Sequence, residues 1–336
     1  MNAVCGIKRG RGEAQVMQTD AIVTIRGPIA PRELGFCQSH EHLSVESAHI
    51  RAIAPELVID DRLKTLSDLR AYRSAGGRAV VDAQPVGAGR NALTLYALSQ
   101  EADVHVIAST GFHRLGFYPP GHWIFEAEED RLAALFTGEL TAGMYVGGEE
   151  GFPVERSELC AGLVKTALEP GPLEGRHALL FRAAAGAAVA AGAPLMAHIE
   201  AGADPLLLAD FLMSCELPPE RVVFCHMDRA VPDLLIHEAV CARGIALEYD
   251  TIARPRHHGD EREIDIIRHM LDAGFGHLLL AGLDVTRLRL AGYGGSPGLD
   301  YILRVFLPAL CAAGVAESQA LKIFVDNPAR VWKMRR

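Results

Sequence analysis

The sequence has no long apolar run and no excess of basic residues. Of its 336 residues, 49% are hydrophobic and 22% are charged, as is usual for a globular chain. No stretch approaches the ~20 consecutive apolar residues that a membrane-spanning helix needs, so no membrane partner is expected. The net charge of -9 leaves the chain without the basic face that binds nucleic-acid phosphates. These absences predict a globular protein whose partner is a small-molecule substrate.

Paired cysteines and an apolar leader are also missing. The seven cysteines are odd in number and scattered, with no C-x-x-C pair, which favours a reducing cytoplasm. The first residues lack the apolar core of about 7–15 residues that marks a secretory signal. We therefore expect a cytoplasmic protein with a flexible extension at residues 1–16. No linker rich in Pro, Gly or Ser divides the rest, so residues 17–336 are expected to form one domain.

Short apolar runs alternate with longer helical patterns along the chain. Eight runs have the length and composition of strands covered on both faces, at residues 34–40, 79–83, 104–109, 162–167, 194–198, 222–225, 245–249 and 278–283. Helical patterns lie between them, at residues 61–75, 92–101, 130–140, 178–191, 204–215, 231–243 and 261–273. Strands that alternate with helices indicate a parallel sheet.

Eight such units over roughly 250 residues predict an α/β fold, the (β/α)8 TIM barrel, whose chemistry lies at the carboxyl ends of the strands. A doubly wound open sheet is the rival fold, but it usually carries a glycine-rich phosphate loop after its first strand. The sequence SHEHLSVES stands there instead. The longest irregular stretches also follow strands, where a barrel keeps its substrate loops, at residues 111–126, 143–158, 251–260 and 284–298.

His40 and His42 flank Glu41 at the end of the first predicted strand. Residues i and i+2 of a strand face the same side, so both imidazoles can reach one metal while Glu41 points into the barrel wall. Taken alone, the pair fits two partly exposed histidines equally well. The positions of other metal-binding residue types favour the metal.

Three such residues, His198, His226 and Asp284, come directly after later apolar runs. In a barrel each would lie at the carboxyl rim, for which a purely structural histidine has no preference. Lys165 lies within the apolar run AGLVKTAL, where a bare ammonium is costly because burial disfavours its charge. A neutral amine beside two cations can instead capture carbon dioxide as a carbamate, an anion able to bridge two metals. The alternative is a lysine that extends its charged end to solvent at the strand end.

With these residues in place, the chain resembles the phosphotriesterase-like branch of the amidohydrolase superfamily. The resemblance begins at VTIRGPIAPRELGFCQSHEHL and continues through IASTGFH, AGLVKTA, HIEAG, CHMD and AGLDVTR. It ends at IFVDNPARVW and covers about residues 20–333. Members of this family are often dimers, so the resemblance is compatible with a homodimer.

The resemblance implies a two-metal centre at the carboxyl ends of the strands. The more buried metal would be held by His40, His42 and Asp284, the more exposed one by His198 and His226, and carboxylated Lys165 and a hydroxide would bridge the two. Zinc is the expected metal, and manganese, cobalt or iron suit the same ligands. The hydroxide would attack the substrate and Asp284 would accept its proton. Asp228 and Asp250 would orient neighbouring ligands.

The loops after the last two strands carry the candidate substrate-binding residues Arg254, Arg256, Arg287, Arg289 and Tyr293. Arginines at the mouth of an acidic protein suggest a phosphate or carboxylate on the substrate. The alternative is that they pair with nearby Asp260, Glu261 and Glu263 on a solvated face. The layout of these loops resembles the branch that hydrolyses phosphorylated sugar lactones. The family's proficient triesterases have a histidine, and its acyl-homoserine lactonases an arginine, where this chain has Thr251.

The loop GFHRLGFYPPGH adds His113 and Tyr118 as candidate substrate contacts. Phe112 and Trp123 are weaker candidates, because such side chains more often pack within a loop. Together these features predict a metal-dependent hydrolase that cleaves a lactone or carboxylic ester, with an anionic substituent on the substrate as an option. A phosphotriesterase is the first alternative.

Two further alternatives come from other classes. A deaminase-type barrel binds a single metal and needs no lysine at the position of Lys165. A non-catalytic binding protein on the same scaffold would be expected to have lost ligands, yet every ligand type of the family is present.

Overall fold

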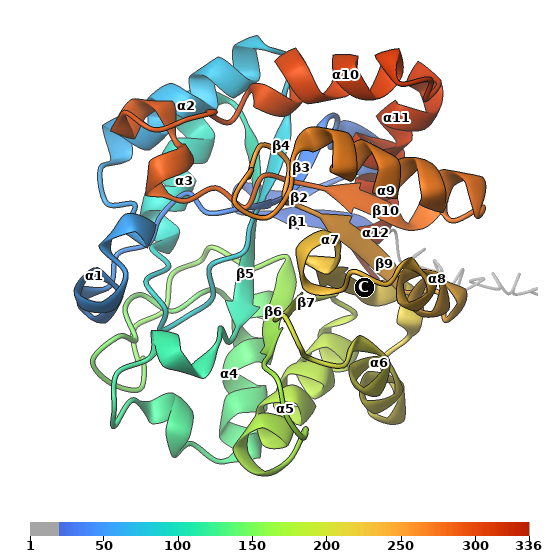
Figure 1. Ribbon diagram of the computed structural model, residues 1–336. Helices are drawn as coiled ribbons and strands as arrows, with labels where there is room; N and C mark the ends of the chain where they lie inside the picture. The colour runs from blue at the N-terminus through green and yellow to red at the C-terminus, as the bar shows by residue number, and fades with distance from the viewer. Residues whose placement is uncertain (1–19, 336) are drawn as a thin grey trace, which may run out of the picture.

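The computed structural model describes residues 20–335. Eight strands form one parallel sheet: β3 (Cys37–Glu41), β4 (Ala79–Asp82), β5 (His105–Gly111), β6 (Leu163–Leu168), β7 (Leu195–Ile199), β8 (Val222–Cys225), β9 (Ala246–Tyr249) and β10 (Leu279–Ala281). They lie side by side in chain order, and β10 contacts β3, so the sheet is a nearly closed barrel (Figure 1). The predicted TIM barrel is confirmed, and each predicted strand overlaps an observed one.

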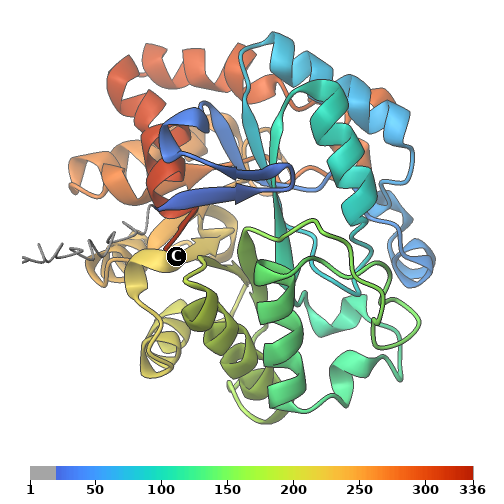
Figure 2. The same cartoon turned by 180° about the vertical axis from the view of Figure 1, so that it is seen from behind.

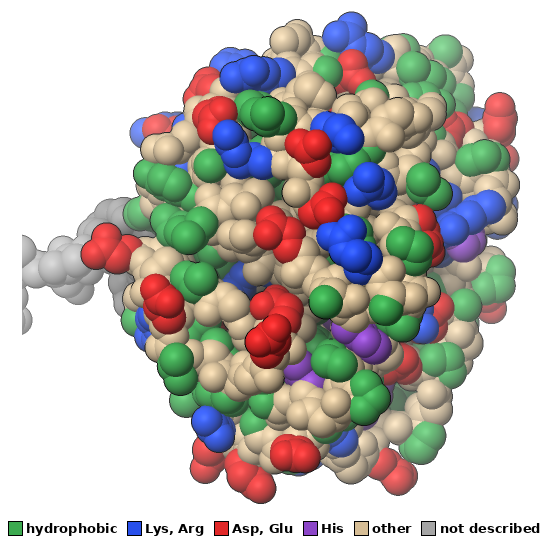
Figure 3. Space-filling view, turned by 90° about the vertical axis from the view of Figure 1, so that its left-hand side faces the viewer, with side chains coloured by type: hydrophobic (Ala, Val, Ile, Leu, Met, Phe, Trp, Pro, Cys, Tyr) green, Lys and Arg blue, Asp and Glu red, His purple; other side chains and the backbone are tan. Residues whose placement is uncertain are grey.

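Helices form an outer layer around these strands (Figure 1). They are α1 (Ala48–Ile53), α2 (Arg62–Ser74), α3 (Ala92–Ala102), α4 (Glu129–Thr141), α5 (Gly175–Ala191), α6 (Pro205–Ser214), α7 (Met227–Ala230), α8 (Leu234–Ala242), α9 (Asp260–Asp272), α10 (Leu307–Ala312), α11 (Glu317–Phe324) and α12 (Asp326–Val331). A π-helical turn, Ile302–Phe306, leads into α10. None of the helices within residues 20–335 is long and apolar enough to cross a membrane. On the face in Figure 3, acidic and basic side chains are interspersed.

The barrel interior and the layer beneath the helices are separate apolar clusters. Val81, Ile107 and Val223 belong to the interior cluster, whereas their neighbours Val80 and Val106 belong to the cluster under the helices. This division follows from the alternation of side chains along a strand. It also explains the continuous apolar runs, because both faces of each strand are covered.

A second, antiparallel sheet covers the end of the barrel where the strands begin (Figure 2). It consists of β1 (Ala21–Thr24), β2 (Gly27–Ile29) and β11 (Lys333–Met334), in the order β11-β1-β2. The amide of Ile25 donates to the carbonyl of Val106 on β5 at 2.8 Å, and the side chain of Trp332 belongs to the interior cluster. This sheet was not predicted, because strands this short show no periodicity.

The first and last barrel strands meet at a seam between β3 and β10. The amide of Asp284 donates to the carbonyl of His40 at 2.9 Å, and the Glu41 carboxylate accepts from the amides of Leu283 (2.9 Å) and Val285 (3.2 Å). A Cβ on Gly282 would lie 2.8 Å from the backbone of His40, so a side chain there would push the two strands apart. The register also shifts within β3 between Gln38 and Glu41.

A buried ion pair ties the loop after α4 to the barrel. The Arg90 guanidinium binds the Glu139 carboxylate in two places, at 2.7 and 2.8 Å, and both side chains are fully buried. Arg90 also donates to the carbonyls of Ser109 on β5 and Tyr145 in the loop. These contacts use the donors of both terminal nitrogens of the guanidinium, which offsets part of the cost of burying the charge, while Nε is buried without a partner.

The helical prediction for residues 231–243 was partly wrong. The structure has a short helix α7 before this range, and α8 begins only at Leu234, where the Asp233 side chain caps it by accepting from the Leu235 amide. The helices from α10 to α12 were not predicted. The predicted extension at residues 1–16 lies outside the described residues.

Candidate metal centre

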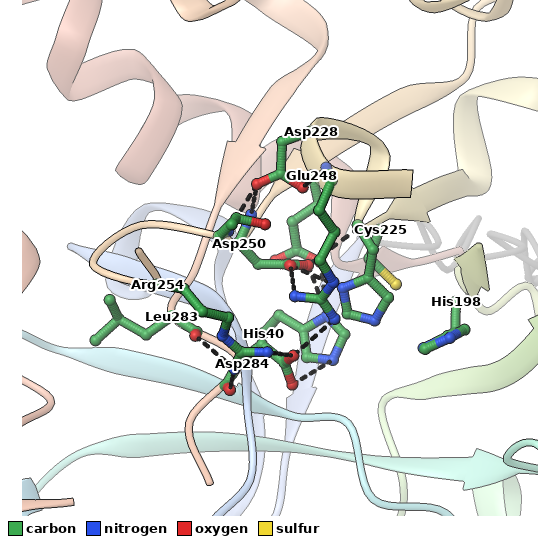
Figure 4. Close-up of polar contacts among 12 residues, drawn as sticks. His40, His198, Cys225, Asp228, Glu248, Asp250, Arg254, Leu283 and Asp284 are labelled. Atoms are coloured by element: carbon green, nitrogen blue, oxygen red, sulfur yellow. Dashed lines mark hydrogen bonds and ion pairs between the residues drawn. The ribbon is translucent and has the colours of Figure 1, made fainter. Parts of the chain in front are cut away.

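Two groups of metal-binding side chains meet at the carboxyl end of the barrel (Figure 4). In the first, His40, His42 and Asp284 bring one ligand atom each within 4.8 Å of one another. The Asp284 carboxylate lies 3.3 Å from His42 Nε2 and 3.8 Å from His40 Nε2. The second group combines His40 with Cys225, His226 and Asp250 within the same limit. His40 therefore lies between the two groups.

Two of these residues have unusual backbone conformations. His226 has φ 67° and Asp284 has φ 47°, in the left-handed region that non-glycine residues seldom adopt. Both follow the last residues of barrel strands, where the chain turns from the strand into its loop. Such strain costs about 1–3 kcal/mol and persists where surrounding contacts hold it, often at functional sites.

Lys165 lies on β6 and is fully buried among the site residues. Its Nζ is 3.3 Å from His40 Nε2, 3.3 Å from Met196 Sδ and 3.4 Å from Cys225 Sγ. Among the residues that the structure describes, no carboxylate forms an ion pair with it. A buried ammonium without an anionic partner is costly, so this position suits a modified or metal-associated lysine better than a bare one.

His198 and His226 face each other across the site. Their rings are 4.3 Å apart between centroids, and in Figure 4 the labelled His198 stands apart from the cluster around His40. Burial lowers the pKa of His198 to about 4 and holds the pKa of His226 well below its ordinary value. Both imidazoles are therefore neutral near pH 7, the form in which histidine binds metals.

Carboxylates hold two of the histidines in place. Asp250 on the β9 end accepts from His226 Nδ1 at 2.7 Å, which leaves Nε2 of that ring free. Glu248, fully buried on β9, lies 3.1 Å from His40 Nδ1. Asp228 does not contact a histidine of the site but positions Asp250, because its carboxylate accepts from the amides of Asp250 (2.9 Å) and Thr251 (2.6 Å). Partners of this kind orient metal-binding histidines and raise their basicity.

Two arginines keep the Asp284 carboxylate ionised. Arg254 and Arg229 lie 3.0 and 2.9 Å from its Oδ2, and Arg229 also pairs with Asp250 at 2.9 Å. Burial alone would raise the pKa of Asp284, but the charges of both arginines and a hydrogen bond with His42 hold it well below its ordinary value. Asp284 is therefore ionised near pH 7, as both a metal ligand and a proton acceptor must be.

The donor set fits divalent cations. His42 Nδ1 is buried without a hydrogen-bond partner, and the buried Lys165 lacks a counter-charge. The neutral imidazoles of His198 and His226 and the ionised carboxylate of Asp284 match the ligand preferences of zinc, and of manganese, cobalt and iron. Of the six ligands predicted from the sequence, His40, His42, His226 and Asp284 belong to the two groups, whereas Lys165 and His198 lie beside them.

A pocket of about 150 Å³ opens above these residues. Of the predicted substrate contacts, His113, Arg254 and Arg256 line it. Tyr118 does not line it and instead accepts the His113 amide hydrogen bond at 2.8 Å. Tyr118 therefore stabilises the loop after β5 and does not face the pocket.

The other predicted substrate contacts are engaged away from this pocket. Arg287 pairs with Asp60 at 3.1 Å, an acid outside the three considered as surface partners. Arg289 is buried and donates to the carbonyls of Ile252 and Ala253. Tyr293 binds the backbone of Asp61 at the start of α2. These three side chains brace the loops after β9 and β10.

Sequence reasoning missed Cys225, which belongs to the second group, and also Glu248 and Arg229. Glu248 is a charged residue within the apolar run of β9, which is the same signal that singled out Lys165. Arg229 lies directly after CHMD and lines the pocket, but the sequence cannot show that its guanidinium turns toward Asp250 and Asp284.

Known proteins resemble this chain over nearly its whole length. The model of the Phosphotriesterase family matches residues 20–332. A phospho-furanose lactonase of Mycoplasmopsis synoviae (strain 53) is 26% identical over 325 residues, 92% of this chain and 90% of the relative. The crystal structure of a lactonase from Listeria monocytogenes shares 26% identity at a TM-score of 0.85, over 94% of this chain and all (100%) of its own. An amidohydrolase from Mycoplasma synoviae, 24% identical, matches in fold at a TM-score of 0.89, over 95% of this chain and 93% of its own.

Proposed function

Because this chain belongs to the phosphotriesterase family, it is a metal-dependent hydrolase of ester bonds, and we propose that it cleaves a lactone or carboxylic ester that carries an anionic substituent. The observation that carries the proposal is the pocket above the candidate metal centre, which combines metal-binding histidines with arginines. The relatives named lactonases support the lactone over the phosphotriester.

In the proposed centre, six side chains hold two divalent ions: His40, His42, Lys165, His198, His226 and Asp284. Lys165 would act as a carbamate, formed when its neutral Nζ adds to carbon dioxide and loses a proton. When bound, the ions supply a hydroxide near neutral pH and polarise the carbonyl oxygen of the ester.

The chain's own residues account for the remaining steps. Asp284, ionised because of Arg254 and Arg229, accepts the proton that is released when the ester carbon is attacked. Asp250 and Glu248 keep His226 and His40 in orientation through their Nδ1 atoms.

Arg256 is the residue that we assign to the anionic substituent. It lines the pocket, and within residues 20–335 it forms no ion pair with an acid, whereas Arg254 is engaged by Asp284. An arginine without an acidic partner at a pocket wall is suited to bind a phosphate or carboxylate.

A hydrolysis screen of metal-replete protein tests the proposal. It compares lactones, phosphorylated sugar lactones, carboxylic esters and phosphotriesters by kcat/KM. We expect lactones or carboxylic esters to exceed triesters, and the reverse ranking would refute the assignment. Arg256→Met should raise KM for substrates with an anionic group about 10-fold or more, without a comparable change for uncharged ones. Arg287→Met is the matched control, because Arg287 pairs with Asp60 outside the pocket.

The two-metal centre has its own test. Lys165→Ala is expected to remove most activity and about one metal ion per chain, with partial rescue by acetate or another small carboxylate. Preserved activity with a single metal per chain would favour the mononuclear alternative. A chain that takes up no zinc or manganese at all would favour the non-catalytic one.

A further inference from the structure

A third cluster of metal-binding side chains lies behind the candidate metal centre. It consists of Asp228 on α7, His258 in the loop after β9, and Glu263 on α9, each with one ligand atom within 4.8 Å of the others. Asp228 and Glu263 are buried, and the His258 side chain is 15% exposed. The cluster is therefore enclosed on the protein side and reachable from solvent along His258.

The atoms that face one another in this cluster lack partners. The Glu263 side chain is fully buried. Both of its carboxylate oxygens and Nε2 of His258 lack a hydrogen-bond partner. His258 Nδ1 donates to the carbonyl of Gly259 at 3.1 Å, and its Nε2 lies 3.4 Å from Glu263 Oε2. Within residues 20–335 no hydrogen bond reaches either oxygen of Glu263, an arrangement that is unfavourable unless a cation or a proton lies there.

The nearby basic side chain does not meet this need. Arg229 directs its guanidinium to Asp250 and Asp284. The Asp228 carboxylate is itself occupied in part, since it accepts from the amides of Asp250, Thr251 and Arg229. Two buried carboxylates and an imidazole therefore share one small space, and no lysine or arginine among residues 20–335 forms an ion pair with Glu263.

We propose that Asp228, His258 and Glu263 form a third cation site, which binds a divalent first-row metal such as Mn²⁺ or Zn²⁺. Two carboxylates and one imidazole are a mixed oxygen and nitrogen set of the kind these ions accept. The ion would join the loop that carries Arg254 and Arg256 to helices α7 and α9. It would also neutralise the carboxylates beside Asp250 and so stabilise the end of β9, which orients His226.

Metal counting on the full chain tests this proposal. The protein is stripped with a chelator, reloaded with excess Mn²⁺, freed of unbound ion by gel filtration and measured by elemental analysis. Glu263→Gln should contain one Mn²⁺ per chain fewer than the native chain. Glu261→Gln, an exposed acid on the same helix, should match the native chain. His258→Ala, partly exposed and outside the helices, should weaken the same ion at least 10-fold even if Glu263→Gln folds poorly.

The outcomes separate this site from the proposed two-metal centre. Lys165→Ala should lose metal from the barrel mouth while it keeps the ion that His258→Ala removes. Equal Mn²⁺ content in the native chain, Glu263→Gln and His258→Ala, with all three folded by circular dichroism, would overturn the third site. In that case a proton shared by the two carboxyl groups would satisfy the cluster instead. Loss of metal in His258→Ala but not in Lys165→Ala would count against the two-metal centre alone.

Discussion

Replacing Asp250 by asparagine should weaken metal binding through an effect on His226. The Asp250 carboxylate accepts from both Nδ1 (2.7 Å) and the amide (3.1 Å) of His226, and pairs with Arg229 at 2.9 Å. An asparagine can present only one oxygen to these three donors, so its NH2 group must face a donor. The imidazole then loses both its fixed orientation and the anion that raises its basicity.

The size of the effect follows from these contacts. Loss of the carboxylate behind a metal-binding histidine typically lowers metal affinity 10- to 100-fold, which is about 1.4–2.7 kcal/mol. The upper part of this range is expected here for two reasons. Asp250 is fully buried, so water cannot replace the lost acceptor, and its charge acts without much screening.

The assay is a competition between the protein and a chromogenic chelator for Zn²⁺ near neutral pH. Glu238→Gln is the matched control: its carboxylate also binds an imidazole, that of His269, at 2.7 Å, but on exposed helices. The control should keep native affinity. If Asp250→Asn bound Zn²⁺ as tightly as the native chain, Asp250 would not support a metal ligand, and the assignment of His226 would fall with it.

Three further outcomes are expected. Arg90→Met should lower the free energy of unfolding by about 3–5 kcal/mol, because it leaves the Glu139 charge buried without its partner; urea unfolding that shows less than about 1 kcal/mol would refute this. Burial raises the pKa of Asp68, so its stabilising contribution is full below about pH 3.8 and is lost as the pH rises through the higher folded-state pKa. Asp68→Asn should therefore show a flatter dependence of stability on pH above pH 4 than the native chain, and an unchanged slope would contradict the shift. Glu248→Ala should weaken Zn²⁺ binding roughly 10-fold by releasing His40. An unchanged affinity in the same chelator assay would show that Glu248 does not support His40.

The barrel was predictable because each of its strands is covered on both faces. Each strand therefore needs a short run of apolar residues in the sequence, whereas the helices between the strands show longer helical patterns. The sheet of β1, β2 and β11 escaped prediction because two to four residues carry no period. The boundary between α7 and α8 depends on the cap at Asp233, which competes with a continuous helical pattern across the same residues.

The sequence could place several candidate ligands at one rim of the barrel, but it could not show their contacts or the part taken by Glu248 and Arg229. A polar residue after an apolar run must lie at the carboxyl rim of a parallel barrel, so His198, His226 and Asp284 could be placed together. Long side chains have no such constraint. Arg289 turns inward to backbone carbonyls while Arg256 reaches the pocket, and only the packing of the two loops decides between these outcomes.

The seam between β3 and β10 has a consequence for how the protein matures. His40 and His42 lie on one side of it and Asp284 on the other, more than 240 residues later in the chain. A cation held by all three would cross the gap between β3 and β10, the neighbouring strands of the ring that lie furthest apart in the sequence and so have the largest loop-closure entropy. Metal loading should therefore slow the opening of the ring at this gap, and a chain deprived of metal should exchange the backbone amides of Leu283 and Asp284 with solvent first.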